Sequence, residues 1–149
     1  MNMKDRILLV FGMGDYRNAE EEALRRAEST SKKIVALQIL NSELYHYGHN
    51  DIIASGRAKS DFLLYIRQEV LEKGRMQAAK LMDKAKARGL QLDLISIETE
   101  NPAEAVITEA RKGYGLVVVP KEPRKLFPLL QRTVSQEVRR KVGCEVIEM

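Results

Sequence analysis

Short apolar runs alternate with helix-forming segments along the whole chain, and this alternation limits the possible folds more than any other feature. Five segments have the apolar character of strands: residues 6–11, 33–40, 90–97, 116–119 and 144–149. Segments with the apolar spacing of helices lie between them, at residues 18–31, 58–88, 101–113 and 133–141. Strands separated by helices form parallel sheets, because each connection must cross one face of the sheet. The sequence therefore predicts an α/β fold, a five-stranded, mostly parallel sheet with helices on both faces.

Local signals mark where these helices begin and end. Pro102 occupies a first helical position, and Gly89 and Gly113 follow the last periodic residues of two helices, where they are expected to end them. Gly74 lies inside the long helix and is expected to weaken it by roughly 1 kcal/mol relative to alanine. Three pairs have the N-cap and N3 spacing of a capping box and predict helix starts: Asn18 with Glu21, Asn101 with Glu104, and Thr133 with Gln136.

The size and charge of the chain exclude several classes of protein. Its 149 residues suit one domain, residues 1–149, with 44% hydrophobic and 31% charged residues. The net charge of +4 permits an anionic ligand and does not indicate nucleic-acid binding. No apolar run approaches the ~20 residues that span a bilayer, and the first residues form a strand and not a signal peptide. A single cysteine, Cys144, cannot form an internal disulfide, so we expect a cytoplasmic protein without a membrane partner.

Three segments in this order resemble the universal stress protein family. "RILLVF" with the following "RNAEEEALRRAESTSKKIVALQIL" resembles its first strand, helix and second strand. "ENPAEAVITEARKGYGLVVVP" resembles its third helix and fourth strand, and "RTVSQEVRRKVGCEVIEM" its closing helix and last strand. The resemblance covers nearly the whole chain. It implies a five-stranded sheet and a homodimer that pairs through the last strand.

The chain departs from that family at the loop after the fourth strand. Members that bind ATP resemble one another in a loop written G-x2-G-x9-G-[ST]. In this chain the three glycine positions correspond to Pro120, Pro123 and Arg132. The stretch between the second and third of these positions is one residue shorter than in the motif. Only the hydroxyl position is kept, as Thr133. Such members also carry an acidic residue at the end of the first strand, where this chain has Gly12. The departures therefore affect both ends of the expected ligand.

The two prolines remove the hydrogen-bond donors that a phosphate needs. Proline has no N–H, and a hydrogen bond to a charged group contributes ~1.5–3 kcal/mol. Losing two would weaken binding by ~3–6 kcal/mol, roughly a hundred- to ten-thousand-fold. Direct contacts from Lys121, Arg124 and Arg132, and the free amides of the helix that begins at Thr133, are an alternative way to hold an anion. The simpler interpretation is that Thr133 only caps a helix and the basic side chains form a solvated rim.

Other candidate sites give weaker patterns. Gly12 and Gly14 follow the first strand, but the third glycine of a dinucleotide fingerprint is missing, which favours a simple strand-to-helix turn over phosphate contact. His46 and His49, with Asp51, have the chemistry of metal ligands. Their spacing in a loop fixes no geometry, so neutral loop side chains are the default and no metal site is predicted. Cys144 is interpreted as a small buried hydrophobic residue.

The last strand places apolar side chains at an edge of the sheet. Val146, Ile147 and Met149 would be exposed there unless something covers them, and an uncovered edge strand tends to aggregate. A second copy of the chain, paired about a two-fold axis, would cover the edge. These residues are therefore the predicted dimer interface.

Three functions follow from these patterns. The first is a non-enzymatic regulatory or stress-response module, a homodimer that lacks the usual ATP loop, needs no cofactor and acts through a protein partner. The second is an adenine-nucleotide binder, for ATP or AMP, that uses Gly12, Gly14 and the basic loop 120–133. The third is a nucleotide hydrolase, for which Glu122 is the only carboxylate beside the loop. The sequence favours the first.

Overall fold

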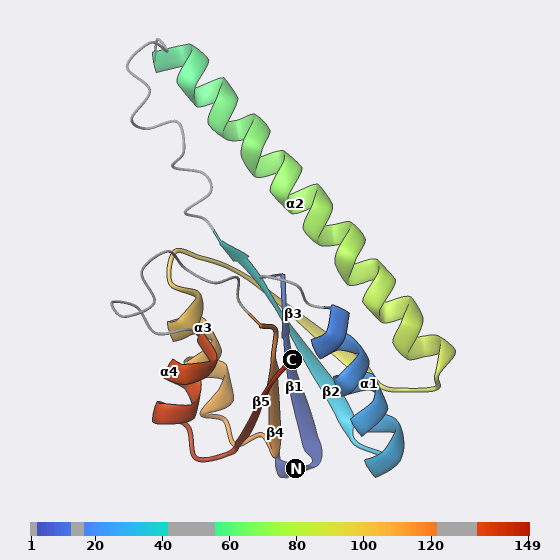
Figure 1. Cartoon of the computed structure of the whole chain (residues 1–149). Coiled ribbons are helices and arrows are strands. Elements are labelled where there is room, and N and C mark those ends of the chain that lie inside the picture. The colour runs from blue at the N-terminus through green and yellow to red at the C-terminus, as the bar shows by residue number, and fades with distance from the viewer. Residues whose placement is uncertain (1–2, 13–16, 42–55, 122–133) are drawn as a thin grey trace.

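The computed structural model describes residues 3–12, 17–41, 56–121 and 134–149 (Figure 1). After a short 3-10 turn at Met3–Asp5, strands and helices alternate. The strands are β1 (Arg6–Phe11), β2 (Lys33–Asn41), β3 (Leu92–Thr99), β4 (Leu116–Val119) and β5 (Glu145–Glu148). The helices are α1 (Arg17–Thr30), α2 (Gly56–Ala87), α3 (Pro102–Ala110) and α4 (Val134–Lys141).

The strands form one parallel sheet in the order β3-β2-β1-β4-β5. Helices α1 and α2 cover one face and α3 and α4 the other, as Figure 1 shows. The central strand β1 is buried on both faces from Ile7 to Phe11, which explains its continuous apolar run. The predicted fold class is confirmed. The third strand begins two residues later than expected, because Leu90 and Gln91 belong to the connection after α2.

The start of α3 agrees with its sequence signals. The Glu104 amide donates to Asn101 Oδ1 at 3.2 Å, and Asn101 Nδ2 donates to Glu104 Oε2 at 3.3 Å. Pro102 is the first residue of the helix. The chain turns at Gly113, whose φ of +100° is costly for any residue with a Cβ. This capping box is therefore confirmed, and α3 packs against β2, β3 and α4.

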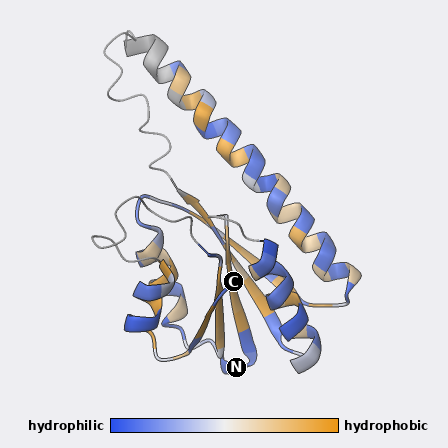
Figure 2. Cartoon of the chain, in the orientation of Figure 1, coloured by the Kyte–Doolittle hydropathy of each residue, from blue (hydrophilic) through white to orange (hydrophobic). Residues whose placement is uncertain are grey.

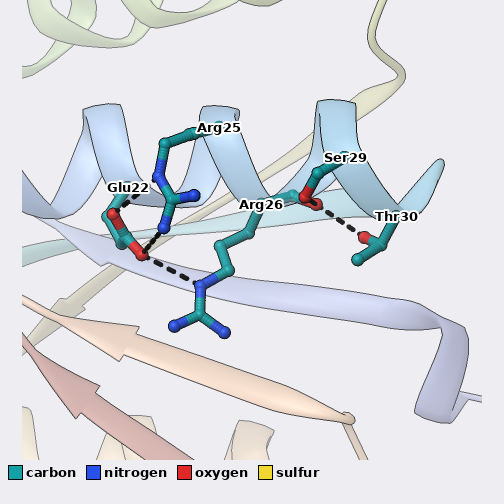
Figure 3. A network of polar contacts seen from close by, with 5 residues as sticks. All are labelled: Glu22, Arg25, Arg26, Ser29 and Thr30. Carbon is teal, nitrogen blue, oxygen red and sulfur yellow. Dashed lines mark hydrogen bonds and ion pairs between the residues drawn. The ribbon is translucent and has the colours of Figure 1, made fainter.

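The start of α1 differs from the prediction. The helix begins at Arg17, so Asn18 lies inside it and the predicted capping box with Glu21 is wrong. The acidic residues of α1 instead bind basic ones. Glu22 accepts hydrogen bonds from Arg25 and, at 2.9 Å, from Arg26 (Figure 3). The hydrogen bond from Arg25, followed by the one from Arg26, lowers the pKa of Glu22.

Helix α2 has 32 residues, so at 1.5 Å per residue it is about 48 Å long and extends well beyond the sheet (Figure 1). Its C-terminal part packs on β2 through Ala78, Leu81 and Ala85. The ammonium of Lys84 lies 2.7 Å from the buried carboxylate of Glu20 on α1. Apart from an ion pair between Arg67 and Glu98 of β3, the described contacts that hold α2 to the sheet and to α1 lie from Gly74 to its C-terminal end.

Gly74 lies where α2 first meets the sheet. A Cβ at this position would lie 2.9 Å from Leu40 Cδ2 and 3.1 Å from Gln38 Nε2. Gln38 is buried, donates to the Gly74 carbonyl at 2.6 Å, and accepts from Ser96 Oγ at 2.8 Å. The sequence interpretation of Gly74 as a weak point was therefore incomplete, because the glycine also permits close packing of helix and strand.

The helices in the described ranges are too polar or too short to cross a membrane.

Candidate ligand-binding edge of the sheet

The fold places one position at which ligands commonly bind. Strand β1 connects through α1 to β2 on one side, whereas β4, its other neighbour, is reached from β3 through α3. The chain therefore reverses its direction across the sheet between β1 and β4. Ligands of open parallel sheets bind at such a switch point, outside the carboxyl ends of the strands. In this chain those ends are Phe11 with Gly12, and Val119 with Pro120 and Lys121.

Gly12 forms one side of the switch point and has no room for a side chain. Its φ is +91°, and a Cβ would lie 2.4 Å from the backbone oxygen of Ile39 on β2. An acidic residue could therefore occupy this position only if the two strands moved apart. The glycine serves the turn out of β1, in agreement with the simpler interpretation of the sequence. Gly14 lies outside the described residues.

Lys121 forms the other side of the switch point. Leu9 pairs with Val118, and Gly12 and Lys121 each follow three residues later in the chain. The Lys121 amide donates to the Met149 carbonyl at 2.9 Å, and the Met149 amide donates to the Val119 carbonyl at 3.0 Å. The start of the loop is thus bound to the end of β5, with the Lys121 side chain exposed.

These contacts leave no amide for a phosphate at the first two loop positions. Pro120 is buried and lacks an N–H, and the Lys121 N–H already has a partner. The remaining candidates of the loop, Arg124, Arg132 and Thr133, lie outside the residues that the structure describes. Their roles stay predictions.

A carboxylate lies at the first turn of α4. Ser135, the second residue of the helix and buried, donates a hydrogen bond from Oγ to Glu148 Oε2 on β5. The N-terminal end of a helix carries partial positive charge and favours an anion. Here the protein's own carboxylate occupies part of that environment. Sequence analysis missed this pair, because thirteen residues separate its members and no motif links them.

Two hollows lie at the opposite, amino end of the sheet. One of about 430 Å³ is bordered by Lys4, Arg111 and Lys141, and one of about 510 Å³ by the turns around Ser31 and Gly89. Both lie away from the switch point. A third, of about 360 Å³, lies beside the carboxyl end of β3. Its charged lining residues are the carboxylates Glu104 and Glu109. This third hollow therefore does not suit a phosphate.

The other candidate groups have structural roles or lie outside the described residues. Cys144 is half-buried against the α3–α4 face, and desolvation raises the pKa of its thiol. Its packing against apolar residues agrees with the interpretation as a small hydrophobic residue, but the side chain is only half-buried and not buried as that interpretation had it. His46, His49 and Asp51 lie outside the described residues. Within the described ranges, no three His, Cys, Asp or Glu side chains come together as metal ligands would.

Comparison with known proteins identifies the fold. No protein-family model matches the chain, and no curated protein matches it. The chain is similar to a universal stress protein family member from Burkholderia pseudomallei, with a TM-score of 0.67 and 19% identity over 100% of this chain and 98% of that one. It is also similar to the universal stress protein UspA of Lactobacillus plantarum, with a TM-score of 0.66 and 17% identity over 100% of this chain and 99% of that one.

Some proteins of this fold were solved with adenine nucleotides. A universal stress protein family protein from Arabidopsis thaliana with AMP bound has a TM-score of 0.63 and 18% identity, over 97% of this chain and 90% of that one. Another universal stress protein was solved in complex with cAMP. One from Archaeoglobus fulgidus was solved in complex with dAMP. At these identities the likeness establishes the fold alone. The chain has the fold of the universal stress proteins, as the sequence resemblance predicted.

Proposed function

We propose that the chain is a non-enzymatic regulatory module with the universal stress protein fold, which acts through a protein partner and does not hold ATP in the family's usual way. One observation carries this proposal: the start of the loop after β4 offers no free amide, because Pro120 has none and that of Lys121 binds Met149. Amide donors are the usual partners of phosphate at such a loop.

The surroundings of the loop support the same conclusion. Gly12 leaves no space for an acidic side chain at the end of β1. Glu148 brings negative charge to the first turn of α4, where it repels a second anion. A nucleotide bound here would therefore depend on side-chain cations in place of backbone amides.

The alternative is an adenine-nucleotide site of that kind, and the AMP-, cAMP- and dAMP-bound proteins of this fold favour it. The phosphates would lie over the switch point beside Gly12 and Gly14, held by Lys121 and by loop residues that no described contact tests: Arg124, Arg132 and Thr133.

A thermal-shift titration with Mg-ATP, AMP and inorganic phosphate separates the two functions. A ligand at about a hundred times its Kd should stabilise the fold by ~2.7 kcal/mol, which is roughly 5–10 °C for a chain of this size. The regulatory module predicts no shift at millimolar ATP. The nucleotide site predicts a rise in Tm with ATP that Lys121→Ala and Arg132→Ala each reduce and that the exposed control Lys80→Ala does not change. This result would establish the nucleotide site and contradict the leading proposal.

We also propose that the module is a homodimer paired through β5. The amide and carbonyl of Met149 both point toward β4. Because backbone direction alternates along a strand, those of Val146 and Glu148 point to the outer edge. No described strand pairs with that edge, although Arg139 Nη2 donates to the Val146 carbonyl at 3.3 Å. A second β5 would replace this exposed contact and cover the half-buried Val146, Ile147 and Met149.

The substitution Val146→Pro tests the β5 interface. Proline removes an N–H that faces outward, so the hydrogen bonds to β4 are kept while pairing with a second chain is blocked. Multi-angle light scattering should show that the variant has half the mass of the wild-type species. Arg139→Ala, which removes only the competing contact, should not lower the mass. A Val146→Pro variant with the wild-type mass, or a monomeric wild type at micromolar concentration, would contradict the interface.

A further inference from the structure

The charged residues that line one hollow at the amino end of the sheet are all cationic. This is the hollow of about 430 Å³, a size typical of small-molecule sites. Three segments meet there, at the end of the sheet where Figure 1 marks the N-terminus. Each contributes one cation: Lys4 from the turn before β1, Arg111 from the end of α3, and Lys141 from the end of α4. We call this place the basic hollow.

Close packing of the backbone fixes Lys4 beside the other two segments. A Cβ on Gly115, which precedes β4, would lie 2.3 Å from the Lys4 carbonyl oxygen, so this approach requires glycine. The Gly115 amide also donates to the Arg6 carbonyl at 3.2 Å. Figure 2 shows mostly apolar strands, whereas α4 and the chain beside the marked N-terminus are hydrophilic. The basic hollow is therefore built into the fold, at the polar margin of an apolar sheet.

The charge of the basic hollow differs from that of the other two hollows described above. The hollow around Ser31 and Gly89 is lined by Glu28 as well as by cations, and its Arg88 forms ion pairs with Glu21 and Glu28. The hollow beside β3 has carboxylates as its charged lining residues. The described lining of the basic hollow contains three cations and no carboxylate. Of the three, it is the one whose charge suits an anion.

Two of the cations keep the capacity to bind a ligand. Arg111 forms no ion pair with a carboxylate in the described part of the chain. Lys141 Nζ lies 3.8 Å from Glu137 Oε2, which is long for an ion pair, and the Lys141 side chain is 45% exposed. Exposed pairs of this kind contribute little to stability. A guanidinium and an ammonium group are common partners of phosphate in proteins.

The simpler interpretation is that these cations only stabilise helix ends. Helices α3 and α4 end beside the hollow, and the C-terminal end of a helix carries about half a negative charge. Two helix ends therefore offset about one of the three positive charges and leave about two. This interpretation also does not account for Lys4, which belongs to neither helix. The remaining charge favours a ligand with two negative charges.

The uncharged lining of the basic hollow is apolar apart from three glycines. Ala110, Tyr114, Val142 and Cys144 border the hollow and also belong to or pack against the core on the α3–α4 face. The Tyr114 hydroxyl donates to Glu109 at 2.6 Å, so this polar group already has a partner. A ligand would therefore contact both cations and apolar groups. Such a lining suits an organic anion better than an inorganic one.

We propose that the basic hollow binds a small organic phosphate. The dianionic phosphate group contacts Arg111 and Lys141, and the organic body lies against apolar lining residues such as Val142. The site is at the opposite end of the sheet from the switch point, so it does not depend on the loop after β4. A rise in Tm with ATP that Arg111→Ala abolishes and Lys121→Ala keeps would belong to the basic hollow and not to the nucleotide site.

Protection of Cys144 tests the site directly. This thiol lines the hollow and belongs to the only cysteine of the chain, so its alkylation reports whether the hollow is occupied. Phenyl phosphate should slow alkylation by N-ethylmaleimide in a saturable way, whereas phenol should not. Arg111→Ala and Lys141→Ala should each raise the half-protecting concentration about tenfold or more, because each removes a charged contact.

Matched variants and ligands decide whether the protection is specific. Arg140→Ala removes a cation from the same helix end but outside the hollow, and Lys121→Ala removes one at the switch point, so both should keep the protection. Inorganic phosphate and succinate should protect less than phenyl phosphate. No protection by phenyl phosphate, or an equal loss of protection in either control variant, would overturn the proposal. Equal protection by inorganic phosphate or succinate would contradict the assignment to organic phosphates.

A comparison of two thiol reagents tests the charge of the hollow without a ligand. Dithionitrobenzoate is a dianion and dithiodipyridine is neutral, and both react with Cys144 by thiol–disulfide exchange. Cations around the thiol should favour the dianion, so the ratio of the two rates should fall severalfold in Arg111→Ala and stay close to wild type in Arg140→Ala. Equal ratios in wild type and Arg111→Ala would contradict an anion site at this hollow.

Discussion

The two parts of α2 belong to one helix, yet their apolar residues have opposite surroundings. Ala78, Leu81 and Ala85 are at most 5% exposed against the sheet, whereas Leu64 and Tyr65 in the N-terminal half of the helix are more than half exposed. Both parts show apolar residues at helical spacing. The comparison shows that periodicity identifies residues that share a face but does not say whether anything packs against that face.

The sharpest test of this difference truncates the same residue type in both parts. Leu81→Ala should lower the free energy of unfolding by about 2–5 kcal/mol, because it leaves a cavity against the sheet. Leu64→Ala should change it by no more than about 0.5 kcal/mol, because the side chain is already in solvent. Urea denaturation at low protein concentration measures both free energies of unfolding. Equal losses would mean that the N-terminal half of α2 is packed in solution.

A second prediction concerns the point at which the two parts meet. Gly74→Leu should destabilise the fold by about 1–3 kcal/mol, because its side chain would be forced against Leu40 and Gln38. Gly74→Ala should be close to neutral, since its Cβ meets only side-chain ends and alanine favours the helix. Met76→Phe, which enlarges an exposed residue two positions further along the helix, is the control and should have little effect. A stable Gly74→Leu variant would show that helix and strand do not approach closely.

The smallest change in stability is expected for the ion pairs of Glu22 on α1, which contact neither part of α2. Glu22→Gln removes the carboxylate bound by Arg25 and Arg26 and should lower Tm by less than about 2 °C at pH 7. The pKa of Glu22 is lowered in the folded state, so its contribution is present above the ordinary glutamate pKa and is lost as pH falls through the folded value. The Tm difference from wild type should therefore shrink below about pH 4.5. A difference that persists in acid would rule out this electrostatic origin.

Much of the fold could be predicted from local sequence. The order of strands and helices follows from apolar runs, and the start of α3 from the spacing of Asn101, Pro102 and Glu104. The same spacing failed at Asn18, because α1 begins one residue earlier and a capping box is only one of several ways to start a helix. Local signals therefore located the elements reliably and their ends less so.

Less of the candidate site could be predicted. The absence of amides at Pro120 was visible in the sequence, but the bond from Lys121 to Met149 and that from Ser135 to Glu148 were not. Both join segments that become neighbours only when β5 pairs with β4. Sequence patterns describe intervals along one element, and these contacts cross between elements.

The α/β class, the identity of the buried strands and the absence of the glycines from the expected loop positions Pro120, Pro123 and Arg132 could all be predicted from the amino-acid sequence. These depend on side-chain polarity and on backbone chemistry, which are properties of single residues. The folded chain was needed to see that Gly74 lets α2 approach β2, that Gly12 must lack a side chain, and that the N-terminal part of α2 extends past the sheet. Those outcomes depend on distances between elements, which are fixed when the sheet assembles.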